Sequence, residues 1–110
     1  MQDMQRKLSW SLMVITYNRA EFLIECLKHA LGQSRMPAEI VIVDASDNWQ
    51  ETLDHIKELY SEHWKNVRLV YEPAKIRGIP YQRNQALDLT TSDVVFSLDD
   101  DIYLWPNAAE

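Results

Sequence analysis

Two continuous apolar runs constrain the fold of this chain more than any other feature. They are residues 12–15 (LMVI) and 40–43 (IVIV), and neither alternates apolar with polar side chains. Uninterrupted apolar strands are typical of parallel sheets whose two faces are both covered. Apolar residues at helical spacing follow each run, on segments that begin near Asn18 and Asn48. We therefore predict parallel strands joined by crossover helices.

The rest of the chain repeats this alternation. The predicted strands lie at residues 8–17, 40–44, 67–71 and 94–98. Helix starts are indicated by Asn18 followed by Glu21, by Asn48 followed by Glu51, and by Pro80 in a first turn. The order β-α-β-α-β-α-β predicts an α/β, Rossmann-like open sheet, mainly parallel, with the strand order 3-2-1-4.

The first helix carries an apolar stripe that we expect to face the sheet. Its members are Phe22, Leu23, Cys26, Leu27, Ala30 and Leu31. Because Cys26 lies on this stripe, a packing role is favoured over that of a nucleophile. As the only cysteine it excludes an internal disulfide, and it fits a reducing compartment.

Charge and hydropathy restrict the possible partners and location. The 110 residues include 11 basic and 17 acidic side chains, a net charge of −6, which argues against binding to nucleic acid. No apolar run approaches the roughly 20 residues of a membrane span. Residues 1–7 form a polar tail without the apolar stretch of a signal peptide. We expect a cytoplasmic protein, free or peripheral at the inner membrane face.

Polar side chains gather where the predicted strands end. Because parallel strands point the same way, their carboxyl ends share one edge, and ligands bind there where the strand order reverses. The residues at this edge are Thr16, Tyr17, Asn18, Asp44, Asp47, Glu72, Asp99, Asp100 and Asp101. With the order 3-2-1-4, the turn after the first strand and the acidic triplet 99–101 would face each other across one crevice.

The acidic triplet indicates a metal site. Adjacent carboxylates repel by about 2–4 kcal/mol per pair at an effective dielectric near 20. In an extended chain Asp99 and Asp101 point the same way, and two convergent carboxylates suit Mg²⁺ or Mn²⁺. A solvated acidic loop is the alternative. The position of the triplet, directly after a buried strand, favours the metal.

The edge lacks the parts that other enzyme classes need. No serine or cysteine pairs with a histidine at a matching strand end, which argues against hydrolase chemistry. Gly32 and Gly78 are the only glycines, so there is no glycine-rich phosphate loop. Asp44 and Asp47 could accept hydrogen bonds from a base or ribose, with Arg83 as the nearby cation. The pattern is that of a nucleoside-diphosphate site.

Four segments, in order, resemble the N-terminal half of the family 2 glycosyltransferases of the GT-A fold. They are residues 14–19 (VITYNR), Gln33 with 39–47 (EIVIVDASD), 78–84 (GIPYQRN) and 96–101 (FSLDDD). The last looks like the metal-binding D-x-D region of that family. Together the segments span most of residues 9–106.

The resemblance implies roles for the turn after the first strand and for the second strand end. Thr16 and Asp44 would contact the nucleobase and ribose, and Tyr17 and Asn18 would shape the wall around them. Arg83 would lie near the base or the diphosphate, with a helix-surface salt bridge as the alternative.

For the acids, the resemblance implies contacts to ribose and metal. Asp99 and Asp100 would contact the ribose or the metal, and Asp101 would bind Mg²⁺ or Mn²⁺ bridging the diphosphate, so Asp99 and Asp101 are the expected metal ligands. Asp47 is assigned to the same nucleotide-sugar site, with simple helix capping as the alternative.

The activity implied is an inverting, metal-dependent glycosyl transfer, as in polysaccharide biosynthesis. The donor would be a UDP-, GDP- or dTDP-sugar, and the acceptor hydroxyl would belong to a glycan or a lipid-linked molecule bound by the full-length protein. The catalytic base and acceptor half of the family lie downstream of the D-x-D region. Residues 8–110 are therefore expected to be a donor-binding fragment, truncated after that region and inactive in transfer by itself.

Two other functions are consistent with parts of the pattern. One is a non-catalytic module that binds a nucleotide sugar. The other is an aspartate phosphoacceptor signalling domain, which also gathers aspartates at strand ends. That domain would need its acids near the first strand and a lysine at a late strand end, whereas here the acids come last.

Overall fold

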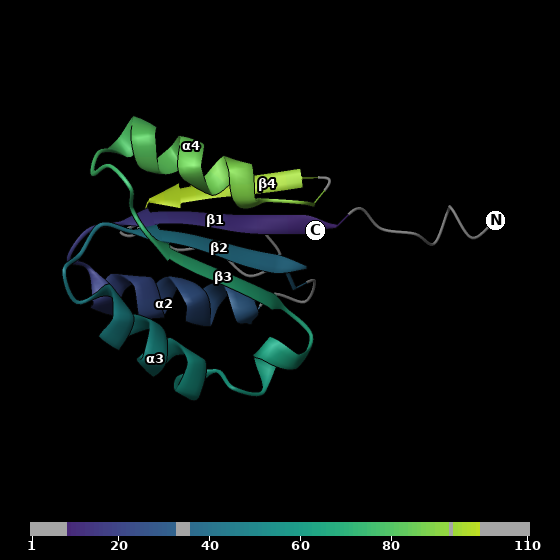
Figure 1. Ribbon diagram of the computed structural model, residues 1–110. Coiled ribbons are helices and arrows are strands. Elements are labelled where there is room, and N and C mark those ends of the chain that lie inside the picture. Colours follow the sequence, from purple (N-terminus) through teal and green to yellow (C-terminus); the bar gives the residue numbers. More distant parts are fainter. Residues whose placement is uncertain (1–8, 33–35, 93, 100–110) are drawn as a thin grey trace.

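A computed structural model describes residues 9–32, 36–92 and 94–99, and Figure 1 shows their arrangement. The strands are β1 (Trp10–Thr16), β2 (Glu39–Asp44), β3 (Arg68–Pro73) and β4 (Val94–Asp99). The helices are α2 (Ala20–Leu31), α3 (Trp49–Leu59), the 3₁₀ turn η1 (His63–Lys65) and α4 (Ile79–Leu89). The predicted β-α-β-α-β-α-β order is confirmed, with η1 as an addition.

The four strands form one sheet in the order β3-β2-β1-β4, and each neighbouring pair is parallel. The predicted topology is therefore confirmed. In the register, Thr16 lies opposite Asp44 and Ile15 lies opposite Asp99. The carboxyl ends of β1, β2 and β4 thus meet at one edge of the sheet.

Helices cover both faces of the sheet, which explains the continuous apolar runs. In Figure 1, α4 lies on one face and α2 and α3 lie on the other. Leu12 and Val14 belong to the core that includes Leu23 of α2, whereas Met13 packs in the core of Ala86 from α4. Burial of each such side chain contributes about 1.5–3 kcal/mol. None of the described helices is long and apolar enough to span a membrane.

The start of α2 differs from the prediction. The N-cap is Arg19, with no side-chain cap bond, whereas Asn18 adopts a positive φ of 53° and cannot form the expected capping box. Phe22 is 39% exposed, and the Arg19 guanidinium lies 5.0 Å from the centre of its ring. The other five members of the predicted stripe are buried, Cys26 among them.

The starts of α3 and α4 agree better with the sequence. Asn48 is the N-cap of α3, although its side chain makes no cap bond. Instead the Asn48 carbonyl accepts the N–H of Glu51 at 3.1 Å. Pro80 lies in the first turn of α4, as predicted, and Gly78 is the N-cap.

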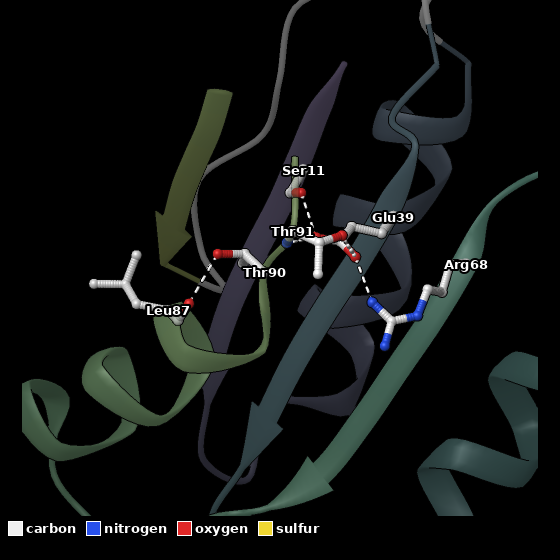
Figure 2. A network of polar contacts seen from close by, with 6 residues as sticks. All are labelled: Ser11, Glu39, Arg68, Leu87, Thr90 and Thr91. Atoms are coloured by element: carbon white, nitrogen blue, oxygen red, sulfur yellow. Dashed lines mark hydrogen bonds and ion pairs between the residues drawn. The ribbon is translucent and has the colours of Figure 1, made fainter. Parts of the chain in front are cut away.

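At the opposite, amino edge of the sheet, the buried carboxylate of Glu39 links several segments by hydrogen bonds (Figure 2). Glu39 is 1% exposed. It accepts hydrogen bonds from the Ser11 hydroxyl at 2.6 Å, from the Arg68 guanidinium at 2.7 Å and from the Thr91 N–H at 2.6 Å. The connection between α4 and β4 is thereby tied to β1, β2 and β3.

Candidate functional site

The carboxyl edge of the sheet brings together several of the predicted site residues. Thr16 and Asp44 are register partners on neighbouring strands, and both are buried. Asp99, the last residue of β4, lies opposite Ile15 on the other side of β1. The turn after β1 thus stands between the ends of β2 and β4, as the predicted strand order requires.

The Asp44 carboxylate is held by its own turn and by β3. Its Oδ1 accepts the N–H of Ser46 at 2.8 Å, and its Oδ2 accepts the hydroxyl of Tyr71. Burial raises the pKa of the Tyr71 hydroxyl, and the hydrogen bond and charge of Asp44 raise it further, against an opposing hydrogen bond with Thr52. Tyr71 therefore remains a protonated donor, and Asp44 keeps a fixed orientation.

The turns after β1 and β2 are linked to each other. The N–H of Asn18 donates to the Ser46 hydroxyl at 2.5 Å, and the N–H of Ala45 donates to the Thr16 carbonyl at 3.0 Å. The Asn18 backbone reaches Ser46 because its φ is positive, a conformation that asparagine adopts more readily than most residues. The polar turn residues thus form a rigid rim beside Asp44.

A hollow of about 430 Å³ opens next to this rim, a volume within the usual range for small-molecule sites. Its lining residues are Asn18, Arg19, Ala20, Glu21, Phe22 and Asn48. Two predicted residues lie nearby in the chain and are exposed: Tyr17 precedes Asn18, and Asp47 precedes Asn48. The hollow lies beside the amino ends of α2 and α3, which carry Ala20 and Asn48 respectively.

Arg77 is a cation at this edge that the sequence did not predict. The guanidinium of Arg77 lies 4.7 Å from the centre of the Tyr17 ring, a cation–π contact. The predicted cation, Arg83, is an exposed residue of α4. Arg77 belongs to the connection before α4, and no local spacing pattern marks it. Ser46 and Tyr71 were also missed, because their partners lie 28 and 27 residues away in the chain.

The metal-binding prediction lies mostly outside the described residues. The backbone of Asp99 ends β4 at the shared edge, and Asp100 and Asp101 are not described. Within residues 9–32, 36–92 and 94–99, no group of three histidine, cysteine or acidic side chains could hold a metal ion. The structure gives the backbone position of Asp99, the first residue of the acidic triplet.

Sequence comparison places this chain among glycosyltransferases. The protein family described as "Glycosyl transferase family 2" matches residues 11–110 of this chain. The chain is 30% identical to the chondroitin synthase of Escherichia coli over 100 residues, covering 91% of this chain and 14% of that protein. It is 31% identical to the hyaluronan synthase of Streptococcus pyogenes over 99 residues, covering 86% of this chain and 23% of that protein. The chain spans less than a quarter of either relative.

The fold is shared with a solved glycosyltransferase. The structure of the mannosyltransferase PcManGT from Pyrobaculum calidifontis, in complex with GDP-Man and Mn²⁺, is similar with a TM-score of 0.74 and 25% identity. The similarity covers 93% of this chain and 30% of PcManGT. The strand order, the position of the polar edge and the matched residues agree with one assignment: this chain belongs to the family 2 glycosyltransferases and has their GT-A fold.

Proposed function

We propose that this chain is the donor-binding part of an inverting, metal-dependent glycosyltransferase. The donor is a nucleoside-diphosphate sugar, and the acceptor is a hydroxyl group bound by a part of the protein beyond this chain. Transfer itself requires an acceptor site and a catalytic base, which we place downstream of residues 99–101. The relatives are named as chondroitin and hyaluronan synthases, which supports a role in polysaccharide synthesis.

The observation that carries the proposal is the shared carboxyl edge of β1, β2 and β4. It sets Thr16 and Asp44 side by side, with Asp99 on the other side of β1. We assign the β1–β2 side to the nucleobase and ribose, because Asp44 is an acceptor held in a fixed orientation. Tyr17 and Asn18, which are exposed on the neighbouring turn, would form the wall of the base site.

The acids at the end of β4 and directly after it in the sequence suit a divalent cation. Asp99 and Asp101 would be its ligands, with Asp100 at the ribose, since carboxylate oxygens are the ligands that Mg²⁺ and Mn²⁺ prefer. The complex of PcManGT with GDP-Man and Mn²⁺ supports a cation of this kind. When bound, the ion would neutralise charge on the diphosphate leaving group.

The residues of this chain would act by binding and orientation. Arg77 and Arg83 are the cations that we assign to the diphosphate, and Arg77 already lies against Tyr17. Asp47 would assist at the ribose. In the complete enzyme the acceptor oxygen forms a bond to the anomeric carbon as the bond to the diphosphate oxygen breaks on the opposite face. The acceptor proton passes to the downstream base, and the anomeric configuration inverts.

Calorimetric titration of UDP and GDP into the chain, with and without MnCl₂, tests the proposal. We expect at least one nucleotide to bind in a Mn²⁺-dependent manner. Replacement of the expected metal ligand, Asp101→Ala, should abolish that dependence, and the matched control Asp54→Ala, on the exposed side of α3, should not. Equal binding by Asp101→Ala and the original chain would contradict the metal assignment, and the absence of any nucleotide binding would contradict the function.

A further inference from the structure

Gln82 is a buried polar residue beneath the carboxyl edge, on the sheet-facing side of α4. It is 4% exposed. Its Nε2 donates to the Thr16 carbonyl at 3.1 Å and to the Val43 carbonyl at 3.1 Å, and its Oε1 accepts the N–H of Gly78 at 3.0 Å. Both amide donors and the acceptor are therefore engaged. A fully satisfied buried amide of this kind fixes the geometry of the groups it joins.

The groups joined by Gln82 are two strand ends and a helix start. Thr16 is the last residue of β1, and Val43 directly precedes Asp44. Gly78 is the N-cap of α4, with a φ of 141° that other residues rarely adopt. The backbone N–H of Gln82 also donates to the Gly78 carbonyl at 2.9 Å. Gln82 therefore binds both polar groups of the Gly78 backbone.

A second glutamine holds the other end of the same connection. The N–H of Lys75 donates to Gln85 Oε1 at 2.9 Å, and Gln85 Nε2 donates to the Pro73 carbonyl at 3.0 Å. Residues 74–78 are thus attached to α4 at both ends. Between the two attachments lies Arg77, whose guanidinium rests 4.7 Å from the centre of the Tyr17 ring.

We propose that Gln82 is a positioning residue of the donor site, an inference that rests on the function proposed above. Its amide holds Gly78, and through it Arg77, against the ends of β1 and β2, where a nucleoside diphosphate would bind. A fixed cation loses less conformational freedom when the ligand arrives, which strengthens binding. Gln82 is too buried to contact the donor itself, so it acts through Arg77.

A double-mutant cycle tests this role. Gln82→Met has a similar volume but no amide, and we expect it to raise the Kd for UDP or GDP in MnCl₂ by about tenfold, the size of one weakened contact to a charged group. Arg77→Ala should weaken binding by at least as much. The double variant should bind no more weakly than Arg77→Ala, because the two residues act through the same contact. Gln50→Met, at an exposed position of α3, is the matched control and should bind normally.

Hydrogen exchange without nucleotide provides a second measurement. Exchange of the amides in residues 74–79 should accelerate in Gln82→Met, with β1 and β2 unchanged. If circular dichroism shows that Gln82→Met is unfolded, Gln82→Glu replaces it, since a carboxylate keeps an acceptor for Gly78 and loses the two donors. If the original chain binds no nucleotide, the proposed function is overturned. Unchanged affinity or unchanged exchange in the folded Gln82 variant, or a loss that adds to that of Arg77→Ala, overturns the positioning role alone.

Discussion

At the scale of the single residue, Tyr71 illustrates how a strand residue supports the site. Its hydroxyl donates to Asp44, and the ring is partly buried on β3. Burial raises the pKa of this hydroxyl above its usual 10.0, and the Asp44 carboxylate raises it further. Since the folded-state pKa is the higher one, the resulting stabilisation is complete below pH 10.0 and is lost as the pH rises above it.

Tyr71→Phe should therefore lower the free energy of unfolding by about 1 kcal/mol at pH 7, because Asp44 loses a donor. The difference in free energy of unfolding between the original chain and Tyr71→Phe should become smaller above pH 10.0. Urea denaturation at a series of pH values measures both effects. Tyr81→Phe, at a side chain that is 56% exposed, is the control and should behave like the original chain. A constant difference at every pH would refute the assigned pKa shift.

Single residues were also where sequence reasoning failed. Asn18 and Glu21 matched a capping box, but Arg19 is the N-cap, and Asn18 has a positive φ and donates its N–H to Ser46 of the next turn. No role was predicted for Gln82, because its partners Thr16 and Val43 lie 66 and 39 residues away in the chain. Such contacts depend on the tertiary arrangement, and no local pattern encodes them.

At the scale of the secondary-structure elements, Glu39 of β2 connects β1, β3 and the segment between α4 and β4. Burial alone would raise its pKa, but the hydrogen bonds from Ser11, Thr91 and Arg68 outweigh it and leave the pKa below the usual 4.5. A lowered folded-state pKa gives stabilisation that is present above pH 4.5 and is lost as the pH falls through the folded-state value. The amino edge of the sheet should therefore loosen in acid.

Glu39→Gln should reduce the free energy of unfolding by about 2–3 kcal/mol at pH 7, because an amide cannot accept all of these donors at once. Below pH 4.5 the difference in free energy of unfolding between Glu39→Gln and the original chain should become smaller. Guanidinium denaturation between pH 7 and pH 3 gives the free energy of unfolding as a function of pH for each of the two proteins. Glu58→Gln, at an exposed position on α3, controls for a general loss of one negative charge. Parallel curves for Glu39→Gln and the original chain would show that Glu39 does not sense the pH.

The elements themselves were largely predictable, and the reason is physical. Each apolar run divides its side chains between two cores, as Leu12 and Met13 do, which is typical of a parallel sheet covered on both faces. β3, at the edge of the sheet, is half exposed and shows the weaker alternation expected there. Of the acidic triplet, Asp100 and Asp101 lie outside the described residues.

At the scale of the whole molecule, charge and topology act together. The chain carries a net charge of −6, and its parallel strands direct the acids that end β2 and β4 to the same edge. Such an edge would repel a nucleoside diphosphate unless a cation intervenes. The affinities for nucleotide and cation should therefore be coupled, and linkage requires that each raise the affinity for the other by the same factor.

Thermal unfolding with the ligands added singly and together checks this coupling. A ligand present at 100 times its Kd adds about 2.7 kcal/mol to the free energy of unfolding. This corresponds to an increase in Tm of roughly 10–20 °C for a domain of this size. We expect that increase with GDP or UDP and MnCl₂ together, and much smaller shifts with either component alone or after EDTA is added. GMP and UMP, which lack the second phosphate for the ion to bridge, are the matched controls and should shift the Tm little. Equal shifts for mono- and diphosphates would indicate that the edge recognises the nucleoside without a cation, and the acids after β4 would then need another explanation.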